Sequence, residues 1–588
     1  MMKRLDRSLA DSILELLSRL RISEQWFLII LASVVGVGGA FGAIIFRELI
    51  GFFHILFFDY GKSILSGISP YWIVLIPLIP AVGGLLVGPL TYRWARETKG
   101  HGVPEVMEAV ALKGGIIRPK VAVVKSLASS ICIGSGGSAG REGPIVQIGS
   151  ALGSTLGQFF RMSGERVKVL VGCGAAAGIS ATFNAPIAGV FFALEVILGD
   201  FAIHTFSPVI ISSFVASIIS RAFLGNYPAF IVPAYDLVSV GEIPLYMVLG
   251  ILAGGVSVLF IKLLYKSEDL FESLKIKGYL KPALGGLLLG IIAIFYPQVF
   301  GVGYEAINAA LHVEMFWGVM FFLIFLKIVA TSLTLGSGGS GGIFAPSLFI
   351  GAMLGGLFGN LVHTLFPQVA AAPGAYALVG MSAVVAGTTH ATLTAMLIIF
   401  EMTGDYRIIL PLMLASVLST LLANRLRKES IYTLKLVRKG ISLKGGWDVS
   451  ILTSTFVREV MSKSWETISQ SMPMGQLMKV VEESRFNFYP VMNDQGELEG
   501  VLSLQDVRNL ITKRGLENLI IVKDVLPGYT QILTEDETLA SALQKFGFRD
   551  VEALPVVDED NPKKLIGVLK RSDIISFYNR KLLERTGK

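Results

Sequence analysis

The chain has 588 residues, of which 53% are hydrophobic and only 16% are charged, and its formal net charge is +7. Because a soluble domain usually carries about 25% Asp, Glu, Lys and Arg, a purely soluble protein is nearly excluded. The charges are also unevenly spread, since residues 441–588 hold 19 Lys and Arg with 21 Asp and Glu, whereas residues 1–440 hold 32 and 23. This break predicts a basic, hydrophobic membrane domain followed by a soluble domain of ordinary composition.

The basic excess lies among hydrophobic segments, where Lys and Arg in loops mark the cytoplasmic side of a membrane protein, so we expect no nucleic-acid partner. Residues 1–24 mix acids, bases and apolar residues and lack the apolar core and cleavage site of a signal peptide. They predict a cytoplasmic amphipathic segment. Cys132 and Cys173 lie in apolar or Gly- and Ala-rich stretches, which favours packing residues over a disulfide framework.

Several apolar segments are long enough for membrane-spanning helices, which need about 20 residues. In chain order they are residues 26–46, 71–90, 209–224, 245–264, 283–295, 317–335 and 408–422. Other apolar stretches are short, broken by Gly and Pro, or interrupted by single charges. In a bilayer, backbone that leaves the helix must be buried in protein or line a watery cavity. The breaks therefore indicate either a pathway or a bundle whose helices cross closely at glycine.

The membrane domain contains an internal repeat. The run GSGGSAGREGP at residues 134–144 returns 202 positions later as GSGGSGGIFAP at residues 336–346. The flanks repeat at nearly the same offset, in GGLLVG at 83–88 with GGLLLG at 285–290 and in GHGVPEV at 100–106 with GVGYEAI at 301–307. The repeat divides the domain into halves at residues 25–230 and 235–435. Duplicated halves with glycine-broken segments at matching places indicate a transport site at the repeat interface near mid-membrane.

The tail repeats with a smaller period. The matching segments are VREVM at 457–461 with VKDVL at 522–526, YPV at 489–491 with LPV at 554–556, and GVL at 500–502 with GVL at 567–569. Short β-rich runs alternate with amphipathic helical stretches in each unit. This pattern predicts a soluble α/β pair, at residues 455–515 and 516–588, joined to the membrane domain by a linker at residues 436–454.

A GSGGS run before a helix lacks bulky side chains, so several backbone N–H groups can converge on a ligand at the positive end of the helix dipole. The result is an anion site without a full cationic charge, which the anion can leave again. Neither run is followed by Gly-Lys-Ser or Gly-Lys-Thr, so a nucleotide phosphate loop is excluded. Close helix packing by small residues is the alternative.

Glu142 stands directly after the first glycine run, beside Arg141. An ionisable residue at membrane depth is a functional candidate. Its carboxylate is itself an anion and can take the place of a transported ion, whereas protonation removes the charge and frees the site. The alternative is a structural ion pair with Arg141 or another cation.

These motifs together resemble the CLC family of chloride channels and proton/chloride antiporters with an appended pair of CBS domains. GREGP at 140–144 and GIFAP at 342–346 agree with two family signatures, and GHGVP at 100–104 resembles a third. The resemblance implies an all-α polytopic membrane domain of roughly eighteen helices in an inverted repeat, many of them short or tilted, followed by an α/β cytoplasmic CBS pair. It also implies a homodimer in the lipid bilayer, with one pathway in each subunit and both termini in the cytoplasm.

By position, the resemblance makes Glu142 the gating and proton-exchanging residue. It implies that Ile343 and Phe344 offer backbone N–H groups to the anion and that Tyr432 offers a hydroxyl. The other anion-binding candidates lie in the three motifs and are His101, Gly102, Val103, Gly140, Arg141, Gly143, Gly342 and Ala345.

Two positions depart from the family pattern. His101 replaces the usual serine, so either its imidazole faces the anion and makes binding depend on pH, or it turns away and Gly102 contributes backbone only. Val196 stands where many antiporters carry an internal proton-transfer glutamate, next to Glu195, which we interpret as structural. Because valine cannot carry a proton, Val196 favours a passive channel, but some antiporters of the family lack this glutamate, so antiport is the alternative.

In the tail, the resemblance implies a nucleotide site in which a Ser or Thr and an Asp three residues later contact the ribose. Ser503 and Asp506 fit this pattern in the first unit, and Lys570 with Asp573 replaces it in the second. We expect either an adenine nucleotide here or a purely structural pair in which Asp506 and Asp573 cap helices.

The sequence therefore predicts a protein of the plasma (inner) membrane of a prokaryote that moves chloride or a similar monovalent anion, without a required cofactor or metal. It predicts a passive voltage- or pH-gated channel, with a proton-coupled antiporter as the alternative. A divalent-cation transporter with CBS regulation is a distant rival, because a hard cation needs carboxylates or carbonyl cages. An enzyme is disfavoured, since the membrane part shows no Ser/His/Asp set, His/Cys cluster or phosphate loop.

Overall fold

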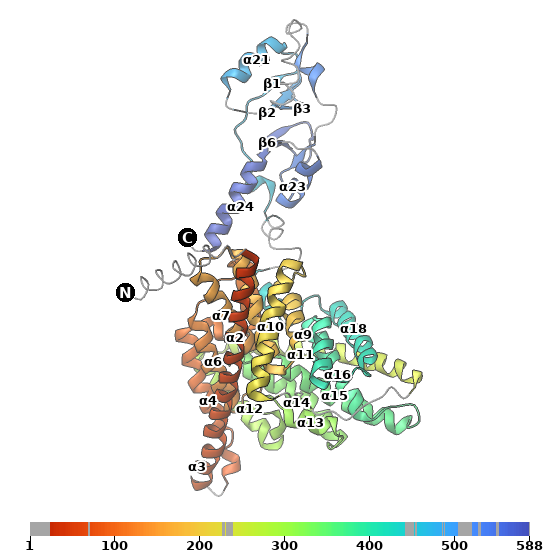
Figure 1. Ribbon diagram of the computed structural model, residues 1–588. Coiled ribbons are helices and arrows are strands. Elements are labelled where there is room, and N and C mark those ends of the chain that lie inside the picture. The colour runs from red at the N-terminus through yellow and green to blue at the C-terminus, as the bar shows by residue number, and fades with distance from the viewer. Residues whose placement is uncertain are drawn as a thin grey trace, which may run out of the picture. The chain divides into compact units, whose positions relative to one another are not determined.

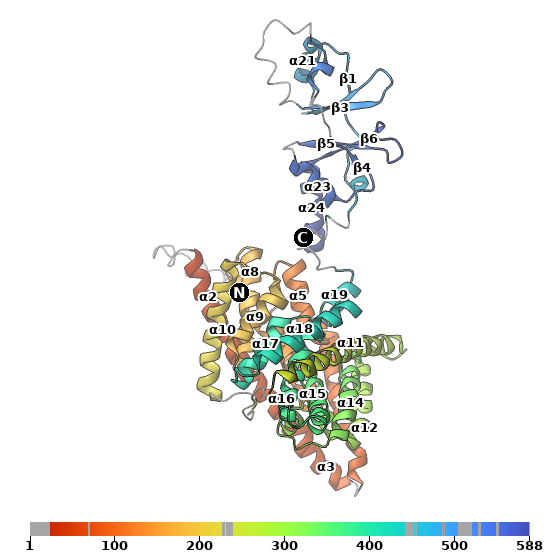
Figure 2. The same cartoon turned by 90° about the vertical axis from the view of Figure 1, so that its right-hand side faces the viewer.

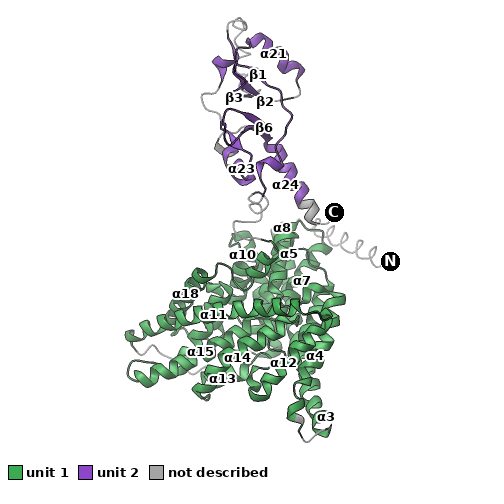
Figure 3. Cartoon of the chain, turned by 180° about the vertical axis from the view of Figure 1, so that it is seen from behind, with its two compact units in different colours: residues 1–441 green, residues 442–588 purple. Residues whose placement is uncertain are grey.

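A computed structural model gives the structure of residues 24–68, 71–225, 230, 239–441, 452, 455–484, 486, 488–503, 520–526, 531–548 and 552–586. The chain divides into two compact units, residues 1–441 and 442–588 (Figure 3). The first unit is a bundle of α-helices, and the second combines small sheets with helices (Figures 1 and 2). The predicted fold class, a helical membrane domain followed by an α/β pair, is thereby confirmed.

The first half of the membrane unit contains helices α2 to α10. Their bounds are α2 (Glu24–His54), α3 (Gly61–Ile68), α4 (Leu78–Pro89), α5 (Val103–Leu112), α6 (Lys120–Gly134), α7 (Glu142–Phe159), α8 (Gly164–Phe183), α9 (Pro186–Phe192) and α10 (Ile203–Leu224).

The second half contains helices α11 to α19. Their bounds are α11 (Ile243–Ser273), α12 (Lys281–Phe295), α13 (Tyr304–Leu311), α14 (Trp317–Gly336), α15 (Phe344–Leu365), α16 (Pro373–Thr389), α17 (Thr392–Thr403), α18 (Ile409–Leu426) and α19 (Thr433–Arg438).

Nine helices in the described part of the chain are long and apolar enough to cross a membrane. They cover the seven segments expected from hydropathy and add α8 and α15. The expected multi-pass membrane protein is therefore confirmed. Sequence reasoning missed α8 because its Gly- and Ala-rich sequence has a mean hydropathy of only 1.2. In the structure, 83% of the most apolar stretch of this helix is buried within the protein. A helix shielded by its neighbours needs small residues more than lipophilic ones.

Glycine serves close packing at the matching helix crossings of the two halves. A Cβ added to Gly149 of α7 would collide with the backbone of Gly174 in α8. Likewise, a Cβ added to Gly351 of α15 would collide with the backbone of Gly380 in α16. These glycines let the helix axes approach, so the packing explanation holds at these positions.

Each half of the membrane unit also supplies a carboxylate that caps a helix of the other half. Glu195 of the first half accepts hydrogen bonds from the backbone N–H groups of Leu393 (3.2 Å) and Thr394 (2.8 Å), at the start of α17. Glu401 of the second half accepts from two N–H groups at the start of α9, at 3.0 and 2.7 Å. A carboxylate at a helix amino end satisfies unpaired donors and complements the dipole. Glu195 therefore has a structural role, and the exchange is reciprocal, as expected for halves related by a twofold axis.

The second unit contains two three-stranded sheets with matching topology. The elements are β1 (Ile468–Ser469), α21 (Met474–Glu483), β2 (Phe488–Met492) and β3 (Leu498–Ser503), then β4 (Leu533–Thr534), α23 (Leu539–Phe548), β5 (Ala553–Val557), β6 (Leu565–Lys570) and α24 (Arg571–Thr586). The first strand pairs parallel with the second, and the second pairs antiparallel with the third, in both sheets. Val491 lies opposite Gly500 as Val556 lies opposite Gly567, so the sequence repeat is also a structural one.

The first residue of each sequence repeat in the second unit packs into the hydrophobic core of the sheet formed by the other repeat. Val457 is buried in the hydrophobic cluster of the second sheet, and its N–H donates to the carbonyl of Glu537 (2.8 Å). Val522 is buried in the cluster of the first sheet, and its N–H donates to the carbonyl of Met472 (3.0 Å). The two halves of this unit are therefore interlocked.

Candidate functional site

The two glycine runs meet at the centre of the membrane unit. Gly140 and Gly342 form an antiparallel bridge, in which the Gly140 N–H donates to the Gly342 carbonyl at 2.8 Å and the reverse bond measures 2.6 Å. The third motif joins them, because the Gly100 N–H donates to the carbonyl of Gly339 at 3.0 Å. Segments separated by about 200 residues are thus joined by backbone hydrogen bonds.

Glycine is required where the motifs touch. A Cβ added to Gly143 would lie 3.0 Å from the Gly342 Cα and would collide with the carbonyl oxygen of His101. Gly102 has φ +85° and directly precedes α5, a conformation that side-chain-bearing residues rarely adopt. Helices α5, α7 and α15 all begin within these motifs. Their amino ends, with unpaired N–H groups and positive dipole ends, therefore converge on one place.

Glu142 is the first residue of α7, and its side chain is buried, with 1% exposed. One carboxylate oxygen accepts a hydrogen bond from the hydroxyl of Tyr304 (3.1 Å), and the other accepts from the N–H of Ala345 (3.3 Å). The carboxylate of the first half thus lies on the amino end of a helix from the second half. It occupies the kind of position in which helix ends bind anions.

Arg141 lies beside the carboxylate without being its hydrogen-bond donor in these contacts. Its guanidinium lies over the ring of Tyr304, 5.3 Å from the centroid, and donates weakly to the carbonyl of Thr182 (3.4 Å). The ring of Phe230 packs edge-on against Tyr304 at 5.4 Å. Tyr304 is therefore clamped by two neighbours while its hydroxyl contacts Glu142.

His101 lies two residues before α5 and Tyr432 directly before α19, helices that are neighbours in the fold (Figure 2). Both are buried, and their ring centroids are 6.1 Å apart. Among the described residues, the Nδ1 atom of His101 is a buried polar atom without a hydrogen-bond partner. Such an atom is costly unless something pairs with it.

Four of the other predicted anion-binding residues lie at the starts of α5 and α15. Val103, Ile343, Phe344 and Ala345 are buried and begin or precede the amino ends of α5 and α15. The Phe344 ring packs against Phe183, with centroids 5.7 Å apart. Of these four residues, Ala345 has an N–H group that contacts the Glu142 carboxylate.

Sequence reasoning missed two buried lysines that hold the motifs in place. Lys125 of α6 is fully buried and donates to the carbonyls of Thr98 (3.0 Å) and Gly100 (2.8 Å). Lys327 of α14, 202 positions later, is also fully buried and donates to two carbonyls ahead of α13, both at 3.0 Å. The shared offset, and a charge inside an apolar helix, were the signals available in the sequence.

Tyr304 was also missed as a functional residue. The repeat aligns GHGVPEV with GVGYEAI, so Tyr304 takes the place that Val103 holds in the first half. This difference between two otherwise similar motifs was the signal. Val196 is buried and apolar, as is consistent with its position in a packed segment between α9 and α10.

The predicted nucleotide residues are only partly described. Ser503 ends β3 and Asp573 lies in the first turn of α24, whereas Asp506 lies outside the described residues. The Lys570 ammonium lies over the rings of Phe486 and Phe488, at 5.4 and 5.6 Å. Within the described ranges, no three His, Cys, Asp or Glu side chains lie close enough together to hold a metal ion.

The chain matches known families over most of its length. The voltage gated chloride channel family matches residues 83–424, and the CBS domain family matches residues 457–513 and 522–580. The chain is 38% identical over 414 residues to a ClcB-like chloride channel protein of Ralstonia nicotianae, covering 69% of this chain and 96% of that protein. It is 32% identical over 592 residues to chloride channel protein CLC-f of Arabidopsis thaliana, covering 87% of this chain and 74% of that protein.

Solved structures show the same fold. A slow cyanobacterial Cl⁻/H⁺ antiporter aligns with a TM-score of 0.66 at 28% identity, covering 71% of this chain and 98% of that one. A eukaryotic CLC transporter aligns with a TM-score of 0.64 at 21% identity, covering 94% and 99%. The chain therefore belongs to the voltage gated chloride channel family, the CLC family of channels and antiporters that its motifs resemble, and it carries a C-terminal pair of CBS domains.

Proposed function

We propose that this chain is a transport protein, not an enzyme, which carries chloride or a similar monovalent anion through a pathway closed by Glu142. The observation that supports the proposal most directly is the position of the Glu142 carboxylate, 3.3 Å from the N–H of Ala345 at the amino end of α15. A negative group already binds there. A transported anion of similar size and equal charge can replace it when the side chain is protonated and moves away.

Backbone amides suit this task better than a buried cation. The amino ends of α5, α7 and α15 supply partial charges that are fixed in direction, and they reduce the desolvation cost of a passing anion without binding it tightly. Lys125 and Lys327 are buried, but each donates hydrogen bonds to carbonyls in or directly before the glycine motifs. The pathway therefore keeps a positive potential, while no lysine is required to release an ion at each transport step.

His101 and Tyr432 are proposed to contact the anion on the other side of Glu142. The unpartnered Nδ1 of His101 supports this role, because an N–H at that atom could donate to an anion beside the Tyr432 ring. An imidazole replaces the serine of the family pattern here. We therefore expect anion preference to change in His101→Ser.

Two transport modes are supported by different observations. Val196, buried and apolar, supports passive conduction, because it offers no group for a proton on its way to Glu142. The structural similarity to a Cl⁻/H⁺ antiporter at 28% identity supports proton-coupled exchange. Simultaneous recording of chloride and proton movement in proteoliposomes under a chloride gradient distinguishes them: uphill proton movement identifies an antiporter, and its absence identifies a channel.

We further propose a homodimer in the plasma membrane of a prokaryote, with both termini in the cytoplasm. Bacterial relatives support the setting, and exposed apolar side chains along α10 and α18, such as Phe214 and Leu421, offer surface for lipid or a second copy. Cysteine labelling from each side of the membrane tests the topology. Cross-linking in lipid tests the dimer.

The test of the main proposal is Glu142→Gln, which keeps the size of the side chain but removes its charge. We expect chloride flux to persist, its pH dependence to be greatly reduced and any proton movement to be lost. Glu165→Gln, on an exposed carboxylate at the start of α8, is the matched control and should behave as the wild type. A Glu142→Gln protein that is folded yet carries no chloride, or that keeps the wild-type pH dependence, would contradict the proposal.

An adenine nucleotide at the CBS pair is a separate proposal, supported by the CBS match and by Ser503 at the end of β3. Titration of the full-length protein with ATP tests it, with Ser503→Ala expected to weaken binding. Equal binding by both proteins would place the nucleotide elsewhere, and no binding would leave the pair with a structural role.

A further inference from the structure

A mostly buried ion pair joins the segments that carry His101 and Tyr432. The Lys435 ammonium of α19 lies 2.6 Å from a carboxylate oxygen of Glu105 in α5, and the two side chains are only 14% and 9% exposed. Glu105 follows His101 by four residues, and Lys435 follows Tyr432 by three. Such spacings correspond to about one helical turn. Each charge therefore lies one turn beyond a residue that is proposed to contact the anion.

The ion pair also touches the GHGVP motif at residues 100–104. A Cβ added to Gly100 would lie 3.0 Å from the Lys435 Nζ atom, so this ammonium packs against the residue directly before His101. The second carboxylate oxygen of Glu105 is buried and, among the described residues, has no hydrogen-bond partner. Without Lys435, a charged carboxylate would be left buried and unpaired, which is strongly unfavourable. The ion pair therefore holds the motif and α19 together.

Other contacts fix the segment before α19 against helices α11 and α16. The Tyr265 hydroxyl of α11 donates to the Ile431 carbonyl (2.6 Å), and the Ile431 N–H donates to the carbonyl of Thr388 in α16 (3.0 Å). The backbone directly before Tyr432 is therefore held from these two helices. The ion pair instead joins α19 to α5, the helix that follows His101. It therefore acts on the spacing between the His101 and Tyr432 side chains.

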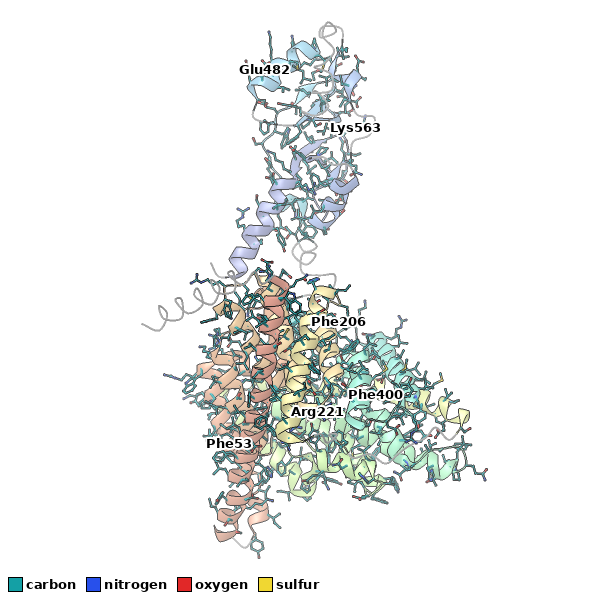
Figure 4. The ribbon with its side chains drawn as sticks, viewed as in Figure 1. Phe53, Phe206, Arg221, Phe400, Glu482 and Lys563 are labelled. Atoms are coloured by element: carbon teal, nitrogen blue, oxygen red, sulfur yellow. The ribbon has the colours of Figure 1, made fainter. Side chains whose placement is uncertain are left out.

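A second ion pair between α5 and α19 lies nearer the surface. Lys439 contacts Glu108 at 2.6 Å, and the side chains are 43% and 17% exposed. Glu108 also binds Lys113 at 2.8 Å, so it keeps a partner when Lys439 is removed. Water screens exposed charges, and their pairs contribute little. Inside the membrane unit, by contrast, side chains fill the space between the helices (Figure 4). Of these two ion pairs, the buried one is therefore suited to fix the helix spacing.

We propose that Lys435 and Glu105 are positioning residues of the anion site. Their ion pair sets the spacing between His101 and Tyr432, and thereby the size of the monovalent anion that these two side chains accommodate. In this role the two charges act through the helices that carry them and not directly on the anion. The inference rests on the proposed anion transport and adds to it a determinant of anion size.

The experiment measures flux through the full-length protein in proteoliposomes, as the half-saturating chloride concentration and the thiocyanate-to-chloride flux ratio. Lys435→Gln and Glu105→Gln each break the ion pair and remove charges of opposite sign. If the charges acted directly on the anion, losing Lys435 would weaken chloride binding and losing Glu105 would strengthen it. Positioning predicts the same direction for both variants, because both release the same spacing.

We expect both variants to raise the half-saturating chloride concentration and to raise the thiocyanate-to-chloride ratio, because a wider site favours the larger anion. The expected factor is roughly two- to thirtyfold, the range over which residues without ligand contact alter a binding site. Lys435→Arg keeps the ion pair and should keep the wild-type ratio. Exchange of the two charges, Glu105→Lys with Lys435→Glu, should move the ratio back toward the wild-type value.

Lys439→Gln is the matched control, because it breaks the exposed ion pair between the same helices, and it should behave as the wild type. If a single variant fails to fold in size-exclusion profiles, the double variant Lys435→Gln with Glu105→Gln, which leaves no buried unpaired charge, should show the raised ratio. Changes of opposite sign in the two single variants, or wild-type ratios in folded variants, would overturn the inference while the proposed transport stands. A wild-type protein that carries no chloride in this assay refutes the proposed function itself.

Discussion

Replacing Tyr304 with phenylalanine should open the pathway without touching the titrating group. The phenol donates to the Glu142 carboxylate at 3.1 Å in a buried site. A hydrogen bond to a charged group contributes about 1.5–3 kcal/mol. The lower figure applies to the Tyr304–Glu142 bond, because it is longer than the shortest charge-assisted bonds. In addition, the contact of Glu142 with the Ala345 N–H remains in the variant. A loss of about 1.5 kcal/mol corresponds to roughly a tenfold shift of the closed-to-open equilibrium.

The assay is chloride efflux from proteoliposomes at neutral pH, where we expect the charged Glu142 carboxylate to keep the proposed pathway closed. We expect Tyr304→Phe to raise flux up to about tenfold and to move acid activation toward higher pH, since the charged, closed form loses a donor. Tyr406→Phe, on a tyrosine with 72% of its surface exposed, is the control. In the Glu142→Gln background, Tyr304→Phe should have little effect, because the charge that the Tyr304 hydroxyl stabilised is gone. Unchanged flux in Tyr304→Phe, or an equal rise in both backgrounds, would refute the reasoning.

Four further substitutions test the framework. Gly143→Ala should abolish most flux, measured in proteoliposomes alongside size-exclusion profiles, because backbone from the other two motifs fills the space of its methyl group. Glu195→Ala and Glu401→Ala should each lower stability by about 3 kcal/mol in thermal unfolding, Glu195 more because Thr394 Oγ1 also donates to it (2.6 Å); equal unfolding to the wild type would remove their capping role. Burial raises the pKa of Glu537, but hydrogen bonds led by that from Lys545 (2.7 Å) outweigh it, so the pKa lies below the ordinary 4.5. Its stabilisation is therefore present at neutral pH and is lost as the pH falls through the lowered pKa. Glu537→Gln should lower the local stability of residues 531–548, measured by hydrogen exchange, by under about 1 kcal/mol at pH 7, and by less in acid.

Much of the architecture could be predicted from repetition in the sequence. A run of small residues that returns at a fixed offset, with matching flanks, implies two copies of one structure, and their meeting point follows from symmetry. The Gly140–Gly342 bridge lies on that meeting point. The role of Glu142 as a gate stays a prediction, although its side chain lies where the motifs predict a site.

Side-chain partners across the repeat interface could not be predicted, because hydropathy patterns carry no information on which distant residues approach. Tyr304 reaches Glu142 across 162 positions, and in the sequence it is one aromatic residue among many. Lys125 and Lys327 resemble interruptions of apolar helices, whereas the structure shows that they donate hydrogen bonds to carbonyls in or directly before the glycine motifs. α8 escaped detection because protein, not lipid, surrounds it.

The reciprocal carboxylate caps have a consequence for biosynthesis. The amino end of α9 depends on Glu401, which leaves the ribosome more than 200 residues later, whereas the cap for α17, Glu195, has already been made when that helix is synthesised. Until Glu401 is synthesised, the N–H groups at the start of α9 therefore lack this carboxylate partner. The second half, in contrast, folds against a first half that already contains Glu195. A nascent chain stopped before residue 401 should expose α9 to proteolysis, and the second half, supplied as a separate polypeptide, should protect it.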